Sequence, residues 1–229
     1  MRHSFNKRAK EYLKNCDIQN DIARILLLFF DYKNIRTVLD LGAGSGNIAK
    51  NLDFNLDYLL AIDNSPTMLA LHPTKLSNIK NIELRECNFE NFIFNQKFDL
   101  LISSSALHWA TNLEVILKNI KDSNNFKYLA FSFFTNKSLN NLHNFLGTKS
   151  PLLSSYDLET ILSKYFIFQS KIMSFKKVFK NRDEYFLYLR GCGLLGGGNL
   201  SFYDKKRLKF EYPFLEADFE VLFVKIKMI

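Results

Sequence analysis

Five strand-like segments, most of them unbroken apolar runs, alternate with helical segments and constrain the fold more than any other feature of this chain. The predicted strands cover residues 37–41, 58–62, 82–85, 98–102 and 128–134, and the helices among them cover 47–52, 65–71 and 112–121. Strands that are apolar along their whole length are buried on both faces, as in a parallel sheet covered by helices. The sequence therefore predicts an α/β fold with a doubly wound, mostly parallel sheet.

The segments on either side of this alternating region complete a single predicted domain over residues 1–229. We expect N-terminal helices within 1–30, a ligand-binding core at 37–134, helices at 138–146, 157–164 and 182–190, and strands at 166–179 and 219–227. Five of the nine glycines lie between residues 191 and 198. Because ligands of open parallel sheets bind beyond the carboxyl ends of the strands, we interpret 180–217 as a lid insertion.

The net charge indicates what kind of partner the protein binds, and the cysteine spacing indicates which kinds of site it lacks. The formal net charge of +8 favours an acidic partner, although a composition that only keeps the protein soluble explains it equally well. Cys16, Cys87 and Cys192 lie far apart with no CxxC pair, which argues against a disulfide framework or a zinc site. The longest apolar run, 25–30, is too short to cross a bilayer. We expect a cytoplasmic protein without a metal ion.

A glycine loop follows the first predicted strand and precedes a helix. Gly42, Gly44 and Gly46 give the spacing GxGxG, one residue short of the GxGxxG pattern of dinucleotide sites. Asp40 stands two residues before the loop, and a carboxylate there suits a cationic ligand group better than a pyrophosphate. The simpler alternative is a tight strand–helix turn that binds nothing.

Polar residues at the ends of the next strands indicate a nucleoside. Asp63 ends the second strand, where a carboxylate can accept hydrogen bonds from both ribose hydroxyls and would repel a 2′-phosphate; it can also be only a helix cap before Ser65-Pro66. Met68 either flanks an adenine or packs in the core. Asn88 and Phe89 follow the third strand, where an adenine edge would lie.

Together these residues resemble the class I S-adenosylmethionine-dependent methyltransferases over about residues 37–134. The resemblance implies a Rossmann-like, seven-stranded sheet with S-adenosylmethionine as cofactor. It also implies that the glycine loop contacts the methionyl group and that Asp63 holds the ribose; the family commonly has Asp where this chain has Asn88. The implied cofactor-binding residues are Gln19, Asp40, Gly42, Ala43, Gly44, Gly46, Asp63, Asn64, Met68, Asn88, Phe89 and Ser104.

The order of motifs along nearly the whole chain is similar to that of the malonyl-acyl-carrier-protein O-methyltransferases of biotin synthesis. The motifs are Phe5-Asn-Lys-Arg-Ala-x-x-Tyr12, Asp63-Asn-Ser-Pro66, Ser104-Ser-Ala-Leu-His-Trp109, Leu129-Ala-Phe-Ser132, Leu189-Arg-Gly191-Cys-Gly193 and Phe219-Glu-Val-Leu-Phe223. This resemblance implies methylation of the free carboxylate of a malonyl thioester on an acidic carrier protein. We expect a monomer that binds neither membrane nor nucleic acid.

The implied reaction needs no general base, because a carboxylate is already anionic at neutral pH. Catalysis would come from alignment and desolvation, and we nominate Tyr12 and His143 as catalytic residues that orient the carboxylate. We expect His108, where the family usually has Gln, to bind substrate together with Trp109 and Arg190. The expected contacts to the acidic carrier are Lys7, Arg8, Lys10, Arg182 and Arg190.

Two other functions fit the same motifs. One is a methyltransferase for another small carboxylic acid or for RNA, although the 23 Phe residues form no evident basic and aromatic platform. The other is a binding module that keeps the fold without the chemistry, against which the intact glycine loop and Asp63 argue.

Overall fold

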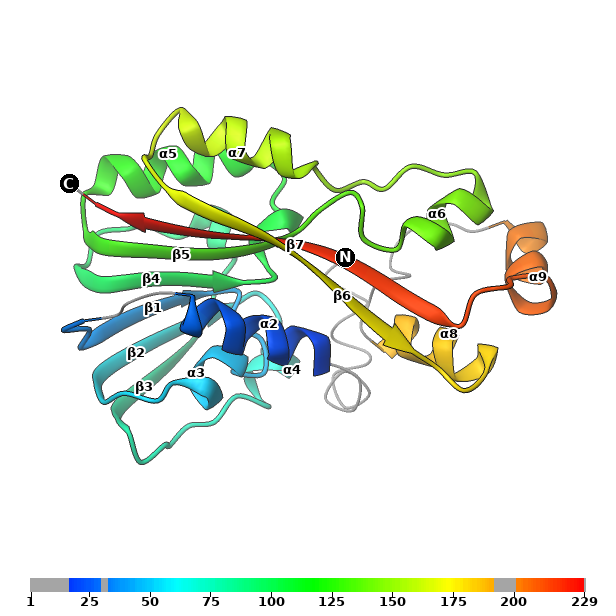
Figure 1. Cartoon of the computed structure of the whole chain (residues 1–229). Helices are drawn as coiled ribbons and strands as arrows, with labels where there is room; N and C mark the ends of the chain where they lie inside the picture. Colours follow the sequence, from blue (N-terminus) through cyan, green and yellow to red (C-terminus); the bar gives the residue numbers. More distant parts are fainter. Residues whose placement is uncertain (1–16, 30–32, 192–200, 229) are drawn as a thin grey trace.

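The computed structural model describes residues 17–29, 33–191 and 201–228 and contains one seven-stranded sheet (Figure 1). The strand order is β3-β2-β1-β4-β5-β7-β6, and β7 alone of these strands runs antiparallel to both of its neighbours. The strands are β1 (Thr37–Leu41), β2 (Leu56–Asp63), β3 (Ile79–Glu86), β4 (Phe98–Ser104), β5 (Phe126–Phe134), β6 (Gln169–Val178) and β7 (Glu216–Lys227). The predicted doubly wound, mostly parallel sheet is confirmed.

The helices also follow the prediction, with one addition. They are α2 (Asp17–Leu28), α3 (Asn47–Asn51), α4 (Pro66–Leu69), α5 (Leu113–Ser123), α6 (Asn140–Leu146), α7 (Ser155–Ser163), α8 (Arg182–Gly191) and α9 (Phe202–Phe210), with short 3-10 turns η1 (Phe89–Asn91) and η2 (Leu107–Trp109). Helix α9 was not predicted, and residues 1–16 of the predicted N-terminal helical segment lie outside the described residues. Within the described ranges, no helix combines the length and the apolar character that a membrane span requires.

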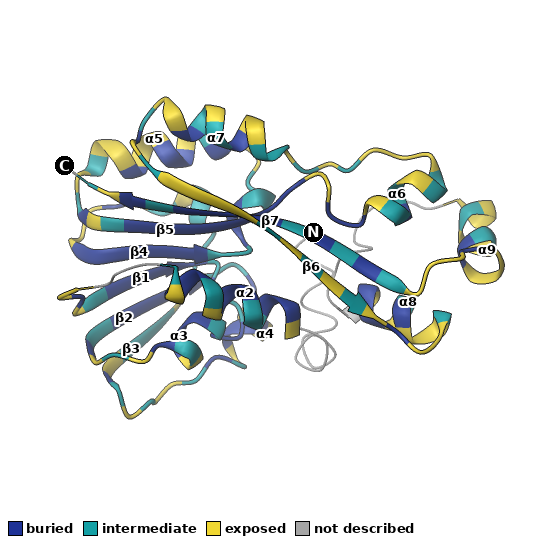
Figure 2. Ribbon diagram, viewed as in Figure 1, coloured by how far each residue is buried: buried dark blue, intermediate teal, exposed yellow. Residues whose placement is uncertain are grey.

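Two hydrophobic clusters, one on each face, hold the sheet between its helices (Figure 2). Successive side chains of a strand point to opposite faces, so Val38 packs in the cluster that contains α2 and α3, and Leu39 packs in the cluster that contains α5 and α7. Leu100 and Leu101 divide in the same way. The central strands carry apolar side chains on both faces along most of their length for this reason, as the sequence indicated.

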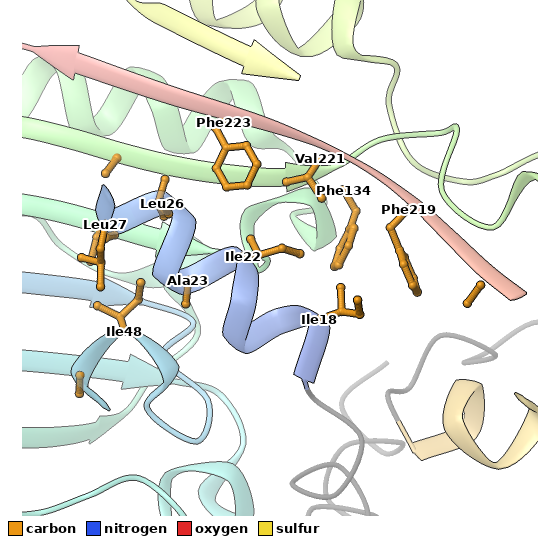
Figure 3. Close-up of a cluster of buried hydrophobic side chains, with 14 of the residues drawn as sticks. Ile18, Ile22, Ala23, Leu26, Leu27, Ile48, Phe134, Phe219, Val221 and Phe223 are labelled. Carbon is orange, nitrogen blue, oxygen red and sulfur yellow. The ribbon is translucent and has the colours of Figure 1, made fainter. Parts of the chain in front are cut away.

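Helix α2 packs on one face of the sheet, next to aromatic residues of β5 and β7 (Figure 3). Ile22 and Leu26 are fully buried and lie toward Phe134 and Phe223 of β5 and β7. Ala23 and Leu27 lie on the side of the helix toward α3. This packing fixes the position of the first turn of α2, which carries Gln19.

The order of strands changes direction between β1 and β4, where ligands of such sheets bind. The last strand passes beyond this edge: Phe134, the final residue of β5, pairs with Val221, so residues 216–220 of β7 extend past the carboxyl end of β5. They pair there with β6, and α8 and α9 are carried at the end of this extension (Figure 1). The predicted insertion therefore leaves the sheet at the edge where ligands bind.

Asp99, at the start of β4, connects the amino ends of the central strands, at the side of the sheet opposite the ligand-binding edge. Its Oδ2 accepts hydrogen bonds from the backbone N–H groups of Arg36 (2.8 Å) and Thr37 (3.0 Å), and Lys127 lies 2.6 Å from Oδ1. Burial acts to raise the pKa of Asp99, but the hydrogen bonds from Lys127 and from the backbone outweigh it and hold the pKa below its ordinary value. Asp99 thus joins β1, β4 and β5.

Replacing this carboxylate should destabilise the protein. We expect Asp99→Ala to lower the free energy of unfolding by about 2 kcal/mol, because hydrogen bonds to a charged group are lost. Since the pKa of Asp99 is depressed, its contribution is complete above about pH 4 and disappears as the pH falls below that value. Urea unfolding at a series of pH values measures both effects. Exposed Asp53 is the control: Asp53→Ala should change stability by under about 0.5 kcal/mol. Equal losses in the two variants would contradict the assignment.

Candidate functional site

A cavity of about 290 Å³ lies at the carboxyl ends of β1, β2 and β4. Its lining comes from the last residues of these strands, from the loops and helix starts that follow them and β3, and from one residue of α2. The lining residues are Gln19, Asp40, Gly42, Ala43, Gly44, Ser45, Asn47, Ile48, Asp63, Asn64, Ser65, Met68, Asn88, Phe89, Glu90, Ser104, Ser105, Ala106, Trp109 and Thr111. Among the residues predicted to bind the cofactor, only Gly46 is absent from this lining.

The glycine loop is shaped by close packing as well as by backbone conformation. The backbone N–H groups of Gly42 and Ala43 both donate to the carbonyl oxygen of Ile62, each at 2.9 Å, which ties the loop to the end of β2. Gly42 has φ +73°, and a Cβ atom there would lie 2.4 Å from the Cβ of Ala106. A side chain at this position is therefore excluded both by conformation and by space.

Gly46 stabilises the loop from outside the cavity. It precedes α3 with φ +83°, and a Cβ atom there would approach Pro73 Cδ to 2.7 Å and His72 Cδ2 to 2.8 Å. Gly46 is thus required by the turn into α3, although it does not line the cavity.

Asp63 is fixed at the end of β2 by the backbone. Its Oδ2 accepts from the N–H of Gly44 at 2.9 Å, and its Oδ1 accepts from the N–H of Ser65 at 2.8 Å. Burial raises the pKa of Asp63, and these backbone donors act in the opposite direction. Each oxygen keeps a further lone pair, so the carboxylate can also accept from a ligand in the cavity.

Asp40 is buried with neither carboxyl oxygen hydrogen-bonded in the described part of the chain. Burial, and after it the charge of Asp63, raises the pKa of Asp40 to about 8. Gln19 Oε1 and Ser45 Oγ line the same cavity and are likewise without a partner among the described residues. Because unpaired buried polar atoms are costly, this concentration indicates a polar ligand that supplies the missing partners.

The opposite part of the cavity is more apolar. Met68 is buried on α4, next to the glycine loop: its Cε lies 3.5 Å from where a Cβ of Gly44 would stand. Phe89 begins η1, which Asn88 caps by accepting a hydrogen bond from the N–H of Glu90 at 3.0 Å. The side-chain oxygen of Asn88, Oδ1, is used in this cap, while the side-chain NH2 group keeps two donors for a ligand.

His108 and Trp109 are adjacent in the chain but line different spaces. Trp109 lines the cavity, whereas His108 lines a separate hollow with Asn112 and Leu158. The His108 ring packs against Trp109 and, at 5.3 Å between centroids, Phe134. Although part of the ring is accessible, both nitrogens are buried with no partner among the described residues, and burial lowers the pKa of His108 to about 3. His108 is therefore a neutral imidazole at physiological pH.

The remaining predicted site residues lie away from the cavity or outside the described ranges. His143 is on α6, where its Nδ1 lies 3.0 Å from Thr148 Oγ1. Arg190 is exposed on α8, and its Nε donates to the carbonyl oxygen of Phe186 at 3.2 Å. Neither lines the cavity, and Tyr12 is not among the described residues. Their roles stay predictions.

Eight lining residues were not predicted from the sequence. They are Ser45, Asn47, Ile48, Ser65, Glu90, Ser105, Ala106 and Thr111. All of them lie within two residues of a predicted one, so the motifs located the loops but not every residue that faces inward. Thr111 enters because its backbone N–H donates to the carboxylate of Glu90, which joins the loops after β3 and β4.

Sequence comparison finds known relatives for the central part of the chain. Residues 38–123 match a family described as "Methyltransferase domain". A malonyl-[acyl-carrier protein] O-methyltransferase of Acetivibrio thermocellus is 31% identical over 147 residues, which cover 61% of this chain and 50% of the relative. The protein of the same name from Bacillus cereus is 26% identical over 151 residues, which cover 61% and 54%. The chain thus spans about half the length of the curated relatives it matches.

Comparison with solved structures shows the same fold over more of the chain. The crystal structure of a putative methyltransferase from Bacillus halodurans superposes with a TM-score of 0.66 at 13% identity, covering 90% of this chain and 98% of that one. The chain has the fold of a class I methyltransferase. The methyltransferase-domain match over residues 38–123 and the shared fold point to S-adenosylmethionine as the cofactor.

The cavity fits the chemistry of S-adenosylmethionine. The unpaired oxygens of Asp40 and Gln19 suit the cationic methionyl end, and Asp63 offers acceptors for the two ribose hydroxyls. Met68 and Phe89 supply apolar surface for the adenine, beside the free amide donors of Asn88. When bound, the cofactor supplies an electrophilic methyl group on a positively charged sulfur.

Binding of this cationic cofactor should release a proton from Asp40. In the free protein the Asp40 pKa of about 8 keeps the carboxyl neutral at physiological pH, and a cation beside it favours the ionised form. Affinity should therefore rise with pH between about 6 and 8. Calorimetric titration in buffers with different ionisation enthalpies measures the protons released. Asp40→Asn should bind without this release; an equal release in both proteins would refute the role of Asp40.

Loss of the Asp63 carboxylate should weaken cofactor binding directly. We expect Asp63→Ala to reduce affinity by about 1.5–3 kcal/mol for each charged hydrogen bond lost, and Asp63→Asn to lose less because it keeps one acceptor. Titration with S-adenosylhomocysteine measures affinity, and urea unfolding shows whether loss of the Gly44 and Ser65 contacts disturbs the loop. Unchanged affinity in a folded Asp63→Ala protein would overturn the site assignment.

Proposed function

We propose that this protein is an S-adenosylmethionine-dependent O-methyltransferase that methylates the free carboxylate of a malonyl group carried as a thioester on an acyl carrier protein, an early step of biotin synthesis. The observation that carries the proposal is the pairing of this cavity with relatives named malonyl-[acyl-carrier protein] O-methyltransferase. We place the reaction in the cytoplasm, in keeping with the cysteine usage of the chain.

The chemistry of the site suits a substrate that is already a nucleophile. A malonyl carboxylate is anionic at neutral pH, so one carboxylate oxygen can take the methyl group while the sulfonium becomes a neutral thioether, with no proton to remove. His108 is poorly suited to act as a base, because both ring nitrogens are buried and its pKa is depressed to about 3. The described lining offers carboxylates at Asp40, Asp63 and Glu90, and none is needed as a base.

The protein's contribution is then to position two groups and to exclude water. Ser104 ends β4, Ser105 follows it, and both line the cavity together with Trp109, on the side where the acceptor would enter. The Ser105 hydroxyl is buried with no partner in the described ranges and is free to donate to a carboxylate. We propose that Tyr12, His143 and Arg190 complete this acceptor side, with His108 and Trp109 as its walls. Catalysis by alignment and desolvation requires no further group.

A methyl-transfer assay tests the function. With S-adenosylmethionine and malonyl carrier protein, we expect the mass of the acyl group to increase by one CH2. The product is the methyl ester, in which a methyl group replaces the carboxyl proton. Mass spectrometry of the intact carrier measures the change. Acetyl carrier protein, which has no free carboxylate, should gain nothing. Absence of methylation on the malonyl carrier, with methylation of a free dicarboxylic acid or of RNA, would replace this function by one of those alternatives.

A further inference from the structure

We propose that helix α9 is the docking surface for the acidic carrier protein, an inference that rests on the proposed function and names where its protein substrate binds. The carrier contacts expected from the sequence were on α8 and near the N-terminus. Helix α9 was not predicted and presents a more concentrated set of cations and exposed aromatic rings.

One face of α9 is exposed and packs against no other described part of the chain. Leu208 is buried and fixes the inner face, while Phe202, Lys206 and Phe210 recur at intervals of four residues on the outer side. The side chains of Phe202 and Phe210 are 85% and 61% exposed, and Tyr203 beside them is 66% exposed. Figure 2 shows α9 at the end of the molecule formed by the β6–β7 extension, with most of its surface exposed. Exposed aromatic rings in such a group are typical of protein interfaces.

The charge of α9 selects an acidic partner. Lys205, Lys206 and Lys209 are exposed, and none of them forms an ion pair with another described residue. The two acidic residues of this segment are already engaged: Asp204 accepts from Ser201 Oγ at 2.6 Å, and Glu211 lies 3.6 Å from Arg207. The outer face therefore carries uncompensated positive charge, which increases the rate of encounter with an acidic protein.

The helix is anchored firmly enough to serve as a platform. Arg207 donates to the carbonyl oxygen of Phe145 on α6 at 3.1 Å, and its guanidinium stacks over the Phe145 ring at 4.6 Å. From α8, Arg182 donates to the carbonyl oxygen of Lys209 at 2.7 Å. These contacts use the inner side of α9 and leave the three lysines outside.

The position of α9 suits delivery of a substrate to the cavity. It is carried by the part of β7 that extends past β5, at the same edge of the sheet as Asp40 and Asp63. No residue of α8 or α9 in the described ranges lines the cavity. A carrier bound on α9 would thus leave the cavity mouth open for an acyl group on a flexible arm.

Charge reversal on α9 tests the proposal. We compare Lys205→Glu/Lys206→Glu/Lys209→Glu with Lys75→Glu/Lys97→Glu/Lys121→Glu, a control that reverses three exposed lysines elsewhere and changes the net charge equally. The substrates are malonyl carrier protein and malonyl-pantetheine, which carries the thioester without the protein. We expect the α9 variant to lose roughly tenfold or more in kcat/KM for the carrier, mainly through KM, and little for malonyl-pantetheine. The control should retain both activities.

A second variant and a binding measurement separate the possible outcomes. Phe202→Ser/Phe210→Ser should weaken carrier binding without removing its salt dependence. Equal kcat/KM for the carrier in wild type and α9 variant would overturn the docking surface and leave the proposed function intact. Equal losses of kcat/KM on the carrier and on malonyl-pantetheine would also overturn the docking surface. If the wild type methylates neither substrate, the proposed function fails; titration of the carrier into both proteins then decides docking alone. Binding of α9 to anionic phospholipid vesicles, with carrier binding unaffected, would assign the helix to a membrane instead.

Discussion

Parallel pairing of β1 with β2 and β4 is the constraint on which the whole site depends. It brings the ends of three strands to one edge, and with them Asp40, Asp63 and Ser104. The glycine loop can close against β2 only because Gly42 has no side chain in the space filled by Ala106. Asp63 then accepts from the loop at Gly44, so the residue expected to hold the ribose also holds the loop. Fold and ligand site share the same contacts here.

The two carboxylates of the cavity differ in how they are satisfied. Asp63 has backbone donors that hold it in place, whereas Asp40 is buried without a partner among the described residues and is neutral before a ligand arrives. A positively charged cofactor changes this balance, since it stabilises the ionised form of Asp40. The methylated cofactor carries one more positive charge than its demethylated product. The same arrangement therefore favours the substrate form of the cofactor over the product form.

Much of this arrangement could be predicted because it is local in sequence. An apolar strand, a glycine loop and an Asp at the next strand end occur within 26 residues, from Val38 to Asp63, and each has a direct structural consequence. Neither Asp40 oxygen has a partner within the described ranges, and this could not be predicted because it depends on how distant segments, such as the first turn of α2 with Gln19, pack around the cavity. Helix α9 was missed because its segment is strongly charged and only Leu208 is buried, so no apolar periodicity marks it. The placement of His143 away from the cavity follows from the extension of β7 past β5, a register that the sequence does not state.

A crystal structure of the protein with S-adenosylhomocysteine tests the central claim most directly. We expect the nucleoside in the cavity beyond β1, β2 and β4, with ribose hydroxyls on Asp63, the amino group beside Asp40 and the adenine between Met68 and Phe89. An empty cavity at saturating ligand, or a nucleoside bound elsewhere on the protein, would contradict it.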